Sequence, residues 1–153
     1  RSSVMDSLDV AVLGATEIDV DFNVNVHTDS NGRIMGGSGG HSDAAAGARL
    51  ALITAPLFRT RLPIVREHVT CVSTPGRDID VLVTQAGVAV NPKNPELRQR
   101  LLDAGLPVVD IRALKALAEK ITGVPEALAP AGRTVANVIY RDGTLLDTIG
   151  LRK

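Results

Sequence analysis

Aromatic residues are almost absent from this sequence. Phe22, Phe58 and Tyr140 are the only ones among 153 residues, which argues against base-stacking platforms and against a recognition surface anchored by aromatic side chains. Positive and negative side chains balance at 17 each. Nothing in the net charge therefore points to a nucleic acid or an anionic membrane as a partner.

Cysteine is nearly absent as well, and long apolar runs are missing. Cys71 is the single cysteine, so no internal disulfide can form, and a cytoplasmic location is expected. No uncharged apolar run approaches the ~18 residues that a membrane helix requires. The first residues, Arg1-Ser2-Ser3, contain neither an initiator Met nor a signal peptide, so we expect a piece of a longer polypeptide.

The sequence does contain enough apolar material for one core. Hydrophobic residues make up 44% of the chain, and a domain of this size buries roughly 70% of the surface that its unfolded chain exposes. We therefore expect residues 1–153 to form a single domain that needs no metal or disulfide for its stability.

Short apolar runs alternate with helical patterns. The polar–apolar alternation of residues 17–27 predicts one long strand with opposite polar and apolar faces. Helices are expected after the N-caps Asn94 and Asp110, and a third after Ser42 or Asp43. The interleaving predicts an α/β domain, with a mixed sheet covered by helices on at least one face. Further strands are expected at 8–14, 50–54, 69–73, 79–84, 87–90 and 106–109, and a hairpin at 134–140 and 144–149.

The glycine-rich loop at residues 36–40 is the strongest local feature. Glycine lets the backbone adopt a positive φ and approach a ligand without a Cβ in the way. The loop leads into a predicted helix start, where free N–H groups would bind a phosphate, a carboxylate or the oxyanion of an acyl intermediate. The alternative is a flexible linker. The candidate catalytic residues are Gly37, Ser38, Gly39, Gly40 and His41, the last as a proton donor or shuttle.

Asn23, Asn25 and Glu17 lie on the polar side of the alternating stretch. Asparagine is a poor strand former, so two in register suggest neutral hydrogen-bond donors for a carboxylate or a thioester carbonyl. Glu17 could serve as a base or nucleophile. The alternative is the solvated face of a half-buried strand. We keep all three as candidate substrate-binding residues, together with Asp43, which is equally suited to cap a helix.

A local excess of positive charge follows the glycine loop. Residues 44–66 contain Arg49, Arg59, Arg61 and Arg66 but no acidic side chain. Arginines suit the phosphates of a cofactor or the acidic surface of a carrier protein. Arg59 and Arg61 are therefore the candidate cofactor-binding residues, and an ordinary solvated surface is the alternative.

A metal site built from His27, His41 and Asp43 is conceivable. However, the histidines have no recognised ligand spacing and there is no second cysteine. No metal is therefore expected.

Three segments together resemble a known family. They are residues 8–19 (LDVAVLGATEID), 21–25 (DFNVN) and 36–43 (GGSGGHSD), and residues 80–92 fit as well. The glycine block combined with the asparagine stripe resembles the C-terminal half of the citrate lyase alpha chain family, over nearly all of the 153 residues.

That resemblance implies a three-layer α/β/α sandwich of the CoA-transferase type, shared with sugar-phosphate isomerases, in which this chain is the C-terminal half of a two-domain subunit. The implied activity is citrate CoA-transfer, in which acetyl on a thioester is exchanged for citrate to give the citryl thioester and acetate. The thioester would be that of CoA or of the phosphopantetheine-type group on the acyl-carrier gamma chain. The implied partners are the N-terminal half of the same subunit, the beta chain and the gamma chain.

Two other functions remain open at the level of sequence. The first is another CoA-transferase or an acyl-CoA hydrolase of the same fold. The second is a non-catalytic half that docks a partner subunit.

Overall fold

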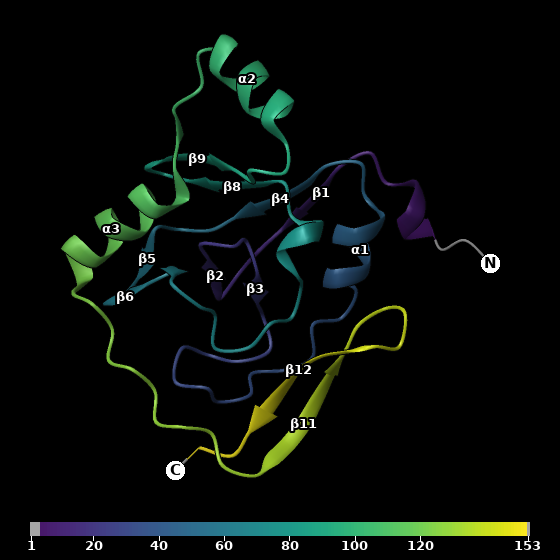
Figure 1. The fold of residues 1–153 in the computed structure, drawn as a ribbon, viewed down its shortest axis with the longest axis vertical. Helices are drawn as coiled ribbons and strands as arrows, with labels where there is room; N and C mark the ends of the chain where they lie inside the picture. The colour runs from purple at the N-terminus through teal and green to yellow at the C-terminus, as the bar shows by residue number, and fades with distance from the viewer. Residues whose placement is uncertain (1–3, 153) are drawn as a thin grey trace.

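A five-stranded mixed sheet organises the chain (Figure 1). The structure, a computed structural model, describes residues 4–152. The strand order is β1-β4-β8-β9-β10. β8 and β9 are antiparallel, and the other neighbours are parallel. The strands are β1 (Ala11–Leu13), β4 (Ala51–Thr54), β8 (Val81–Thr84), β9 (Gly87–Val90) and β10 (Val108–Val109), each inside a predicted apolar run.

Three α-helices flank this sheet. α1 (His41–Gly47) and α3 (Ile111–Thr122) lie on one side of β8 and β9, and α2 (Pro95–Asp103) lies on the other (Figure 1). The Asp110 carboxylate accepts a hydrogen bond from Arg112 N at 2.7 Å and caps α3, as predicted.

The cap expected for α1 is wrong. Gly40 is the N-cap and no side chain makes a capping hydrogen bond, because Ser42 and Asp43 already lie inside the first turn. Two short 3-10 helices complete the helical elements of the described chain, η1 (Val4–Ser7) and η2 (Gly76–Asp78).

The single strand predicted for residues 17–27 is also wrong, because this segment folds back on itself. Phe22 has a φ of 66°, and Asp19 Oδ1 accepts a hydrogen bond from Asn23 N at 2.8 Å. The Asp19 side chain thus provides turn chemistry that the apolar alternation conceals. The segment forms β2 (Glu17–Asp19) and β3 (Val24–Asn25), in a sheet of order β3-β2-β7 with β7 (Val65–Arg66).

One core joins these parts and confirms the mixed α/β class. It lies between the five-stranded sheet, the β3-β2-β7 sheet, α1 and α3. A small hairpin of β5 (Phe58–Arg59) and β6 (Leu62–Pro63) precedes β7. Large and fully buried side chains of the core include Phe22, Ile53, Leu57, Leu82 and Leu114.

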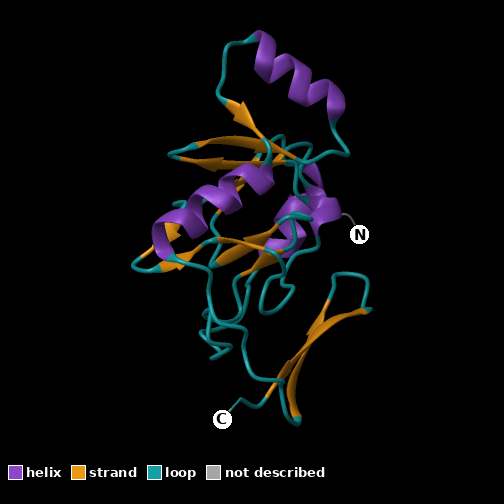
Figure 2. Cartoon of the chain, turned by 60° about the vertical axis from the view of Figure 1, so that its left-hand side comes forward, coloured by secondary structure: helices purple, strands orange, loops and turns teal. Residues whose placement is uncertain are grey.

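The C-terminal hairpin forms as predicted, from β11 (Thr134–Ile139) and β12 (Leu145–Gly150). Figure 2 shows it at the end of the molecule opposite α2. It packs against Cys71 through Val138 and Ile149. Cys71 is buried, as expected, but the strand predicted at residues 69–73 is wrong, because these residues pack beneath the hairpin and only the next residue, Thr74, forms a β-bridge.

Candidate functional site

The glycine loop lies open on the surface at the start of α1. Gly37, Gly39 and Gly40 are exposed and Ser38 is half-buried. Gly39 has a φ of +56°, and a Cβ built on Gly37 or Gly39 would meet nothing within 4 Å. Within residues 4–152 the N–H groups of Gly37, Gly39 and Gly40 have no acceptor, whereas His41 N donates to Ser38 O at 3.1 Å. A ligand could approach these amides without displacing a side chain.

His41, the first residue of α1, is held between two other segments. Its Nε2 lies 2.9 Å from Gly14 O and its Nδ1 lies 2.8 Å from Thr74 Oγ1. A carbonyl oxygen can only accept, so Nε2 donates to Gly14 O and, in the neutral ring, Nδ1 accepts from the Thr74 hydroxyl. Burial lowers the pKa of His41; the hydrogen bond to Gly14 raises it and the charge of His27 lowers it, by smaller amounts. The neutral ring thus fixes the start of α1 beside the end of β1, and its proton-shuttle role stays a prediction.

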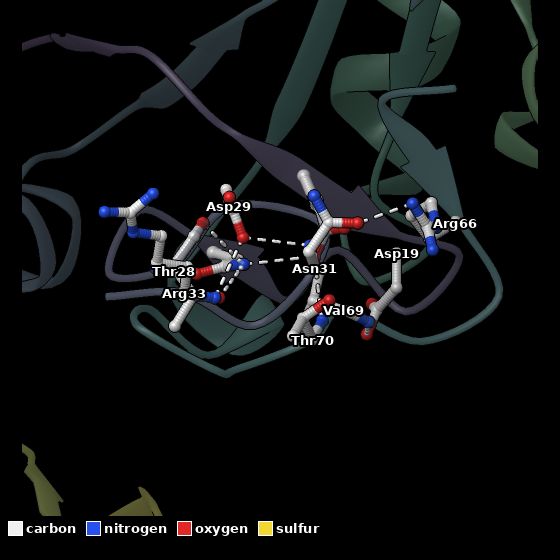
Figure 3. Close-up of polar contacts among 10 residues, drawn as sticks. Asp19, Thr28, Asp29, Asn31, Arg33, Arg66, Val69 and Thr70 are labelled. Atoms are coloured by element: carbon white, nitrogen blue, oxygen red, sulfur yellow. Dashed lines mark hydrogen bonds and ion pairs between the residues drawn. The ribbon is translucent and has the colours of Figure 1, made fainter. Parts of the chain in front are cut away.

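Glu17, Asn25, Thr28 and Arg66 form a buried polar cluster; contacts of Thr28, Arg66 and Thr70 are drawn in Figure 3. Glu17 Oε2 accepts hydrogen bonds from Asn25 Nδ2 at 3.0 Å and Thr70 N at 2.8 Å. Glu17 Oε1 lies 3.2 Å from Arg66 Nη1, an ion pair without hydrogen-bond alignment. Asn25 Nδ2 contacts Thr28 Oγ1 at 2.9 Å, and Asn25 Oδ1 accepts from Thr28 N at 3.1 Å.

The solvated face that the alternation suggested is therefore wrong for Glu17 and Asn25, whose exposed fractions are both 0%. A buried carboxylate needs a cation and hydrogen-bond donors around it, and Glu17 has both. Both Nδ2 and Oδ1 of Asn25 already have hydrogen-bond partners within the chain. This geometry supports a positioning role for both residues, and direct contact with a substrate stays a prediction.

The side-chain amide of Asn23 is also hydrogen-bonded within the chain. Its Nδ2 donates to Asp19 Oδ2 at 3.1 Å, and its Oδ1 accepts from Gly76 N at 2.9 Å. Burial raises the pKa of Asp19, and hydrogen bonds from Asn23 and from backbone N–H groups lower it by smaller amounts. Asn23 therefore ties the turn between β2 and β3 to η2.

The four arginines that follow the glycine loop diverge in space. Arg66 enters the buried polar cluster, and Arg49 forms an exposed ion pair. Arg59 and Arg61 are exposed at the turn between β5 and β6. Arg59 also lines a cavity of about 210 Å³ with Met35. Met35 directly precedes the glycine loop, so Arg59 is the one of these four arginines that shares a cavity with the residue before the loop.

Asp43 and His27 each contact a side chain of a distant segment. Asp43 Oδ1 lies 3.9 Å from Arg141 Nε, and His27 Nδ1 lies 2.5 Å from Ser73 Oγ. Among residues 4–152, no group of three or more His, Cys, Asp or Glu side chains could hold a metal ion. Within the same range, every helix is too short or too polar to cross a membrane.

Comparison with known proteins relates this geometry to a family. The family model described as "Citrate lyase, alpha subunit (CitF)" matches residues 1–151. The chain belongs to the citrate lyase alpha subunit family. The citrate lyase alpha chain of Klebsiella pneumoniae is 52% identical to it over 149 residues, and that of Escherichia coli (strain K12) is 47% identical over 149 residues. Both matches cover 97% of this chain, and the resemblance seen in the sequence is confirmed.

The chain spans 29% of the length of each of those two relatives. A solved structure from Streptococcus mutans, described as the putative alpha subunit of citrate lyase in complex with citrate, is similar to it with a TM-score of 0.96 and 42% identity. That match covers 100% of this chain and 30% of the other. A mutant RipA structure, at a TM-score of 0.50 and 22% identity over 75% of this chain and 28% of the other, shows similarity of fold alone.

The hydrogen-bond partners of these polar side chains lie far away in the sequence and could not be predicted from it. Thr74 contacts His41 from 33 positions away, Ser73 contacts His27 from 46, and Thr70 contacts Glu17 from 53. No local spacing carries such information. One feature of the sequence could have indicated these contacts. Small polar residues surround Cys71, and a buried strand does not require them.

Proposed function

We propose that this chain contributes the acyl-binding part of a citrate CoA-transferase site in a citrate lyase alpha subunit. In the proposed reaction, citrate replaces the acetyl group on a thioester, which gives the citryl thioester and releases acetate. The thioester is that of CoA or of the phosphopantetheine-type group on the acyl-carrier gamma chain, in an assembly with the beta chain and in the cytoplasm. Family membership carries the proposal, because the chain matches that family over nearly its whole length.

The glycine loop is proposed to stabilise the negative charge that develops on the thioester carbonyl oxygen. When a citrate carboxylate attacks the acetyl carbonyl carbon, that carbon becomes tetrahedral and its oxygen becomes an anion. Its collapse breaks the C–S bond and leaves a thiolate and a mixed anhydride of acetate and citrate. The thiolate then attacks the citryl carbonyl of the anhydride, which forms the citryl thioester and releases acetate. Backbone donors aimed at such an oxygen stabilise the transition state more than the substrate. The unpartnered N–H groups of Gly37, Gly39 and Gly40 support this role, and the Ser38 hydroxyl is a further donor.

The remaining candidate residues are proposed to act around this loop. His41 and the buried polar cluster position it, because His41 anchors the helix into which the loop leads. Asp43 is near enough to the loop, and exposed enough, to contact a substrate. Arg59, with Arg61 beside it, is proposed to bind the cofactor phosphates, which the cavity shared by Arg59 and Met35 supports.

The other wall of the site is proposed to come from the rest of the subunit. The N–H groups of the glycine loop are open on the surface of this chain, and the chain spans under a third of the length of its relatives. Such an arrangement agrees with a two-domain subunit in which this chain is the C-terminal half.

The test is a chimaera in which this chain replaces the matched segment of the Klebsiella pneumoniae alpha chain. With acetyl-CoA and citrate, the chimaera is expected to form citryl-CoA and acetate. The Gly39→Val variant should lose on the order of 100-fold or more in rate, because a β-branched residue is strained at positive φ and its side chain would cover the amides. Gly105→Val is the matched control, since Gly105 also has a positive φ and open space around it but lies after α2, outside the glycine loop.

Two outcomes would overturn the proposal. One is an unchanged rate for Gly39→Val, with its circular dichroism spectrum also unchanged. The other is release of acetate without citryl-CoA, which would identify an acyl-CoA hydrolase.

A further inference from the structure

Two consecutive residues, Ser73 and Thr74, hold both ends of the glycine loop through histidine side chains. At the end of the loop, the His41 ring contacts Thr74 Oγ1 at 2.8 Å. At its beginning, Met35 N donates to His27 O at 2.8 Å, and the His27 ring contacts Ser73 Oγ at 2.5 Å. The exposed fractions of Ser73 and Thr74 are only 2% and 0%. The two attachments of the loop therefore meet at one buried segment.

The hydroxyl group of Ser73 fixes the position of the proton on the His27 ring. Ser73 Oγ accepts hydrogen bonds from Val26 N at 2.9 Å and from His27 N at 3.2 Å. A hydroxyl group has two lone pairs and one proton, so both lone pairs are occupied and the proton is left for the His27 ring. His27 Nδ1 is therefore the acceptor, and in the neutral ring Nε2 carries the proton.

A protonated His27 ring does not fit this arrangement. It would carry a second proton on Nδ1, and this proton would point at a hydroxyl oxygen whose lone pairs are already occupied. His41 differs in this respect. In the described part of the chain, the His41 ring is the only hydrogen-bond partner of the Thr74 hydroxyl, so this hydroxyl can rotate and accept a bond from a protonated ring. The arrangement is selective for the neutral ring at His27.

Several ionisable side chains lie on the segments that surround His27. They are His41 on α1, Asp29 and Arg33 in the turn before the glycine loop, Glu17 and Arg66 in the buried polar cluster, Asp147 of the hairpin and Cys71 beneath it. Burial lowers the pKa of His27, and the charge of His27 lowers the pKa of His41. A charged His27 is thus opposed by burial and, when His41 is charged, by repulsion between the two rings.

We propose that His27 and Ser73 form a positioning pair, which holds the glycine loop for catalysis only while the His27 ring is neutral. This inference rests on the proposed transfer reaction. The pair acts through the backbone, because the His27 N–H binds Ser73 and the His27 carbonyl binds Met35, the residue before the loop. Donors aimed at a developing charge are effective when their positions are fixed before the reaction. Protonation of His27 is expected to release Ser73 and, with it, the beginning of the loop.

The first measurement is nuclear magnetic resonance of the ring nitrogens and backbone amides in the 153-residue chain. His27 is expected as the Nε2–H tautomer at about pH 7.5. Lowering the pH to about 5.5 should shift the amide signals of residues 35–40, and His27→Asn should reduce these shifts. Asparagine does not titrate, and its Oδ1 accepts a bond from Ser73 as Nδ1 does. His68→Asn is the matched control, because His68 is exposed and its replacement should leave the shifts unchanged.

The second measurement is the pH dependence of kcat in the Klebsiella pneumoniae chimaera. His27→Ala should lower kcat at about pH 7.5 on the order of tenfold or more, with little change in KM, since the loop amides act on the transition state. His27→Asn should restore most of the rate. It should also lose less of its rate than the unchanged chimaera when the pH falls to about 5.5, whereas His68→Asn should keep the unchanged profile. Titration of citrate affects all of these enzymes equally.

Two results would overturn the proposal. One is the Nδ1–H tautomer at His27, or amide shifts in the loop that are the same in His27→Asn and in the unchanged chain. The other is an active chimaera whose pH profile is the same with His27→Asn as without it. A folded chimaera that forms no citryl-CoA, together with the expected tautomer and amide shifts, would refute the proposed function alone.

Discussion

Glu17 and Arg66 form an ion pair in the interior, with Oε1 and Nη1 3.2 Å apart and the Glu17 side chain fully buried. The carboxylate also receives hydrogen bonds from Asn25 Nδ2 and Thr70 N. One side chain on β2 therefore joins β3, β7 and the segment that leads to Cys71. This relationship determines the first prediction.

Glu17→Gln should lower the free energy of unfolding by about 3–5 kcal/mol, because it leaves the Arg66 charge buried without a counter-charge. Urea denaturation monitored by circular dichroism measures the change. Glu67→Gln is the matched control: Glu67 pairs with Arg112 and Lys115 at the surface, where solvent screens the charges and the loss of stability should be much smaller.

Adding Arg66→Met to Glu17→Gln should recover part of the lost stability, since the uncompensated charge is then removed. A double variant that is less stable than Glu17→Gln alone would contradict this account of the pair.

Gly76→Ala should destabilise the fold strongly. A Cβ at this position would overlap the carbonyl oxygen of Asp21 in the turn between β2 and β3, and overpacking against backbone costs ~1–3 kcal/mol or more. Gly14→Ala is the control, because a Cβ there would meet nothing within 4 Å and its φ is not positive. Thermal unfolding of the two variants compares them directly, and equal melting temperatures would argue against the close approach.

The stability of the chain should decrease in mild acid in a way that depends on His41. Its folded pKa lies below the ordinary value of 6.5, so the unfolded state takes up the proton first as the pH falls. The contribution of His41 to the free energy of unfolding is therefore complete above 6.5 and is lost as the pH falls through that value toward the folded pKa.

Urea midpoints at about pH 7.5 and about pH 5.5 test this dependence. His41→Gln should show a smaller decrease between the two than the unchanged chain. Because the pKa of His27 is also lowered by burial, part of the decrease should remain in that variant. Identical decreases would mean that the pKa of His41 is the same in the folded and unfolded states.

Cys71 should report the opening of the C-terminal hairpin. Burial, with Asp147 as a lesser cause, raises the pKa of its thiol to about 12, and a protonated, buried thiol is a poor nucleophile. Iodoacetamide at about pH 8 should alkylate it on the order of 100-fold more slowly in the folded chain than in urea. Val138→Ala, which loosens the contact between the hairpin and Cys71, should speed alkylation, whereas Leu117→Ala on the exposed side of α3 should not.

Sequence patterns predicted the elements whose signals are local. Asp110 caps α3 through a bond to a backbone N–H two residues away, and the Asp142-Gly143 turn closes the β11–β12 hairpin with a positive φ at Gly143. The prediction of one long strand at residues 17–27 was wrong because of a local interaction too. Hydrogen bonds of the Asp19 side chain compete with the strand, and a count of apolar alternation ignores them.

By itself, the sequence determined the α/β class, the open glycine loop before α1 and the family to which the chain belongs. The tertiary structure alone decided that Glu17 and Asn25 are buried and that His41 is fixed by Gly14 and Thr74. The physical reason is the distance along the sequence between the groups that interact. Turns and caps depend on groups within a few residues, whereas burial depends on partners such as Thr70, which lies 53 positions from Glu17.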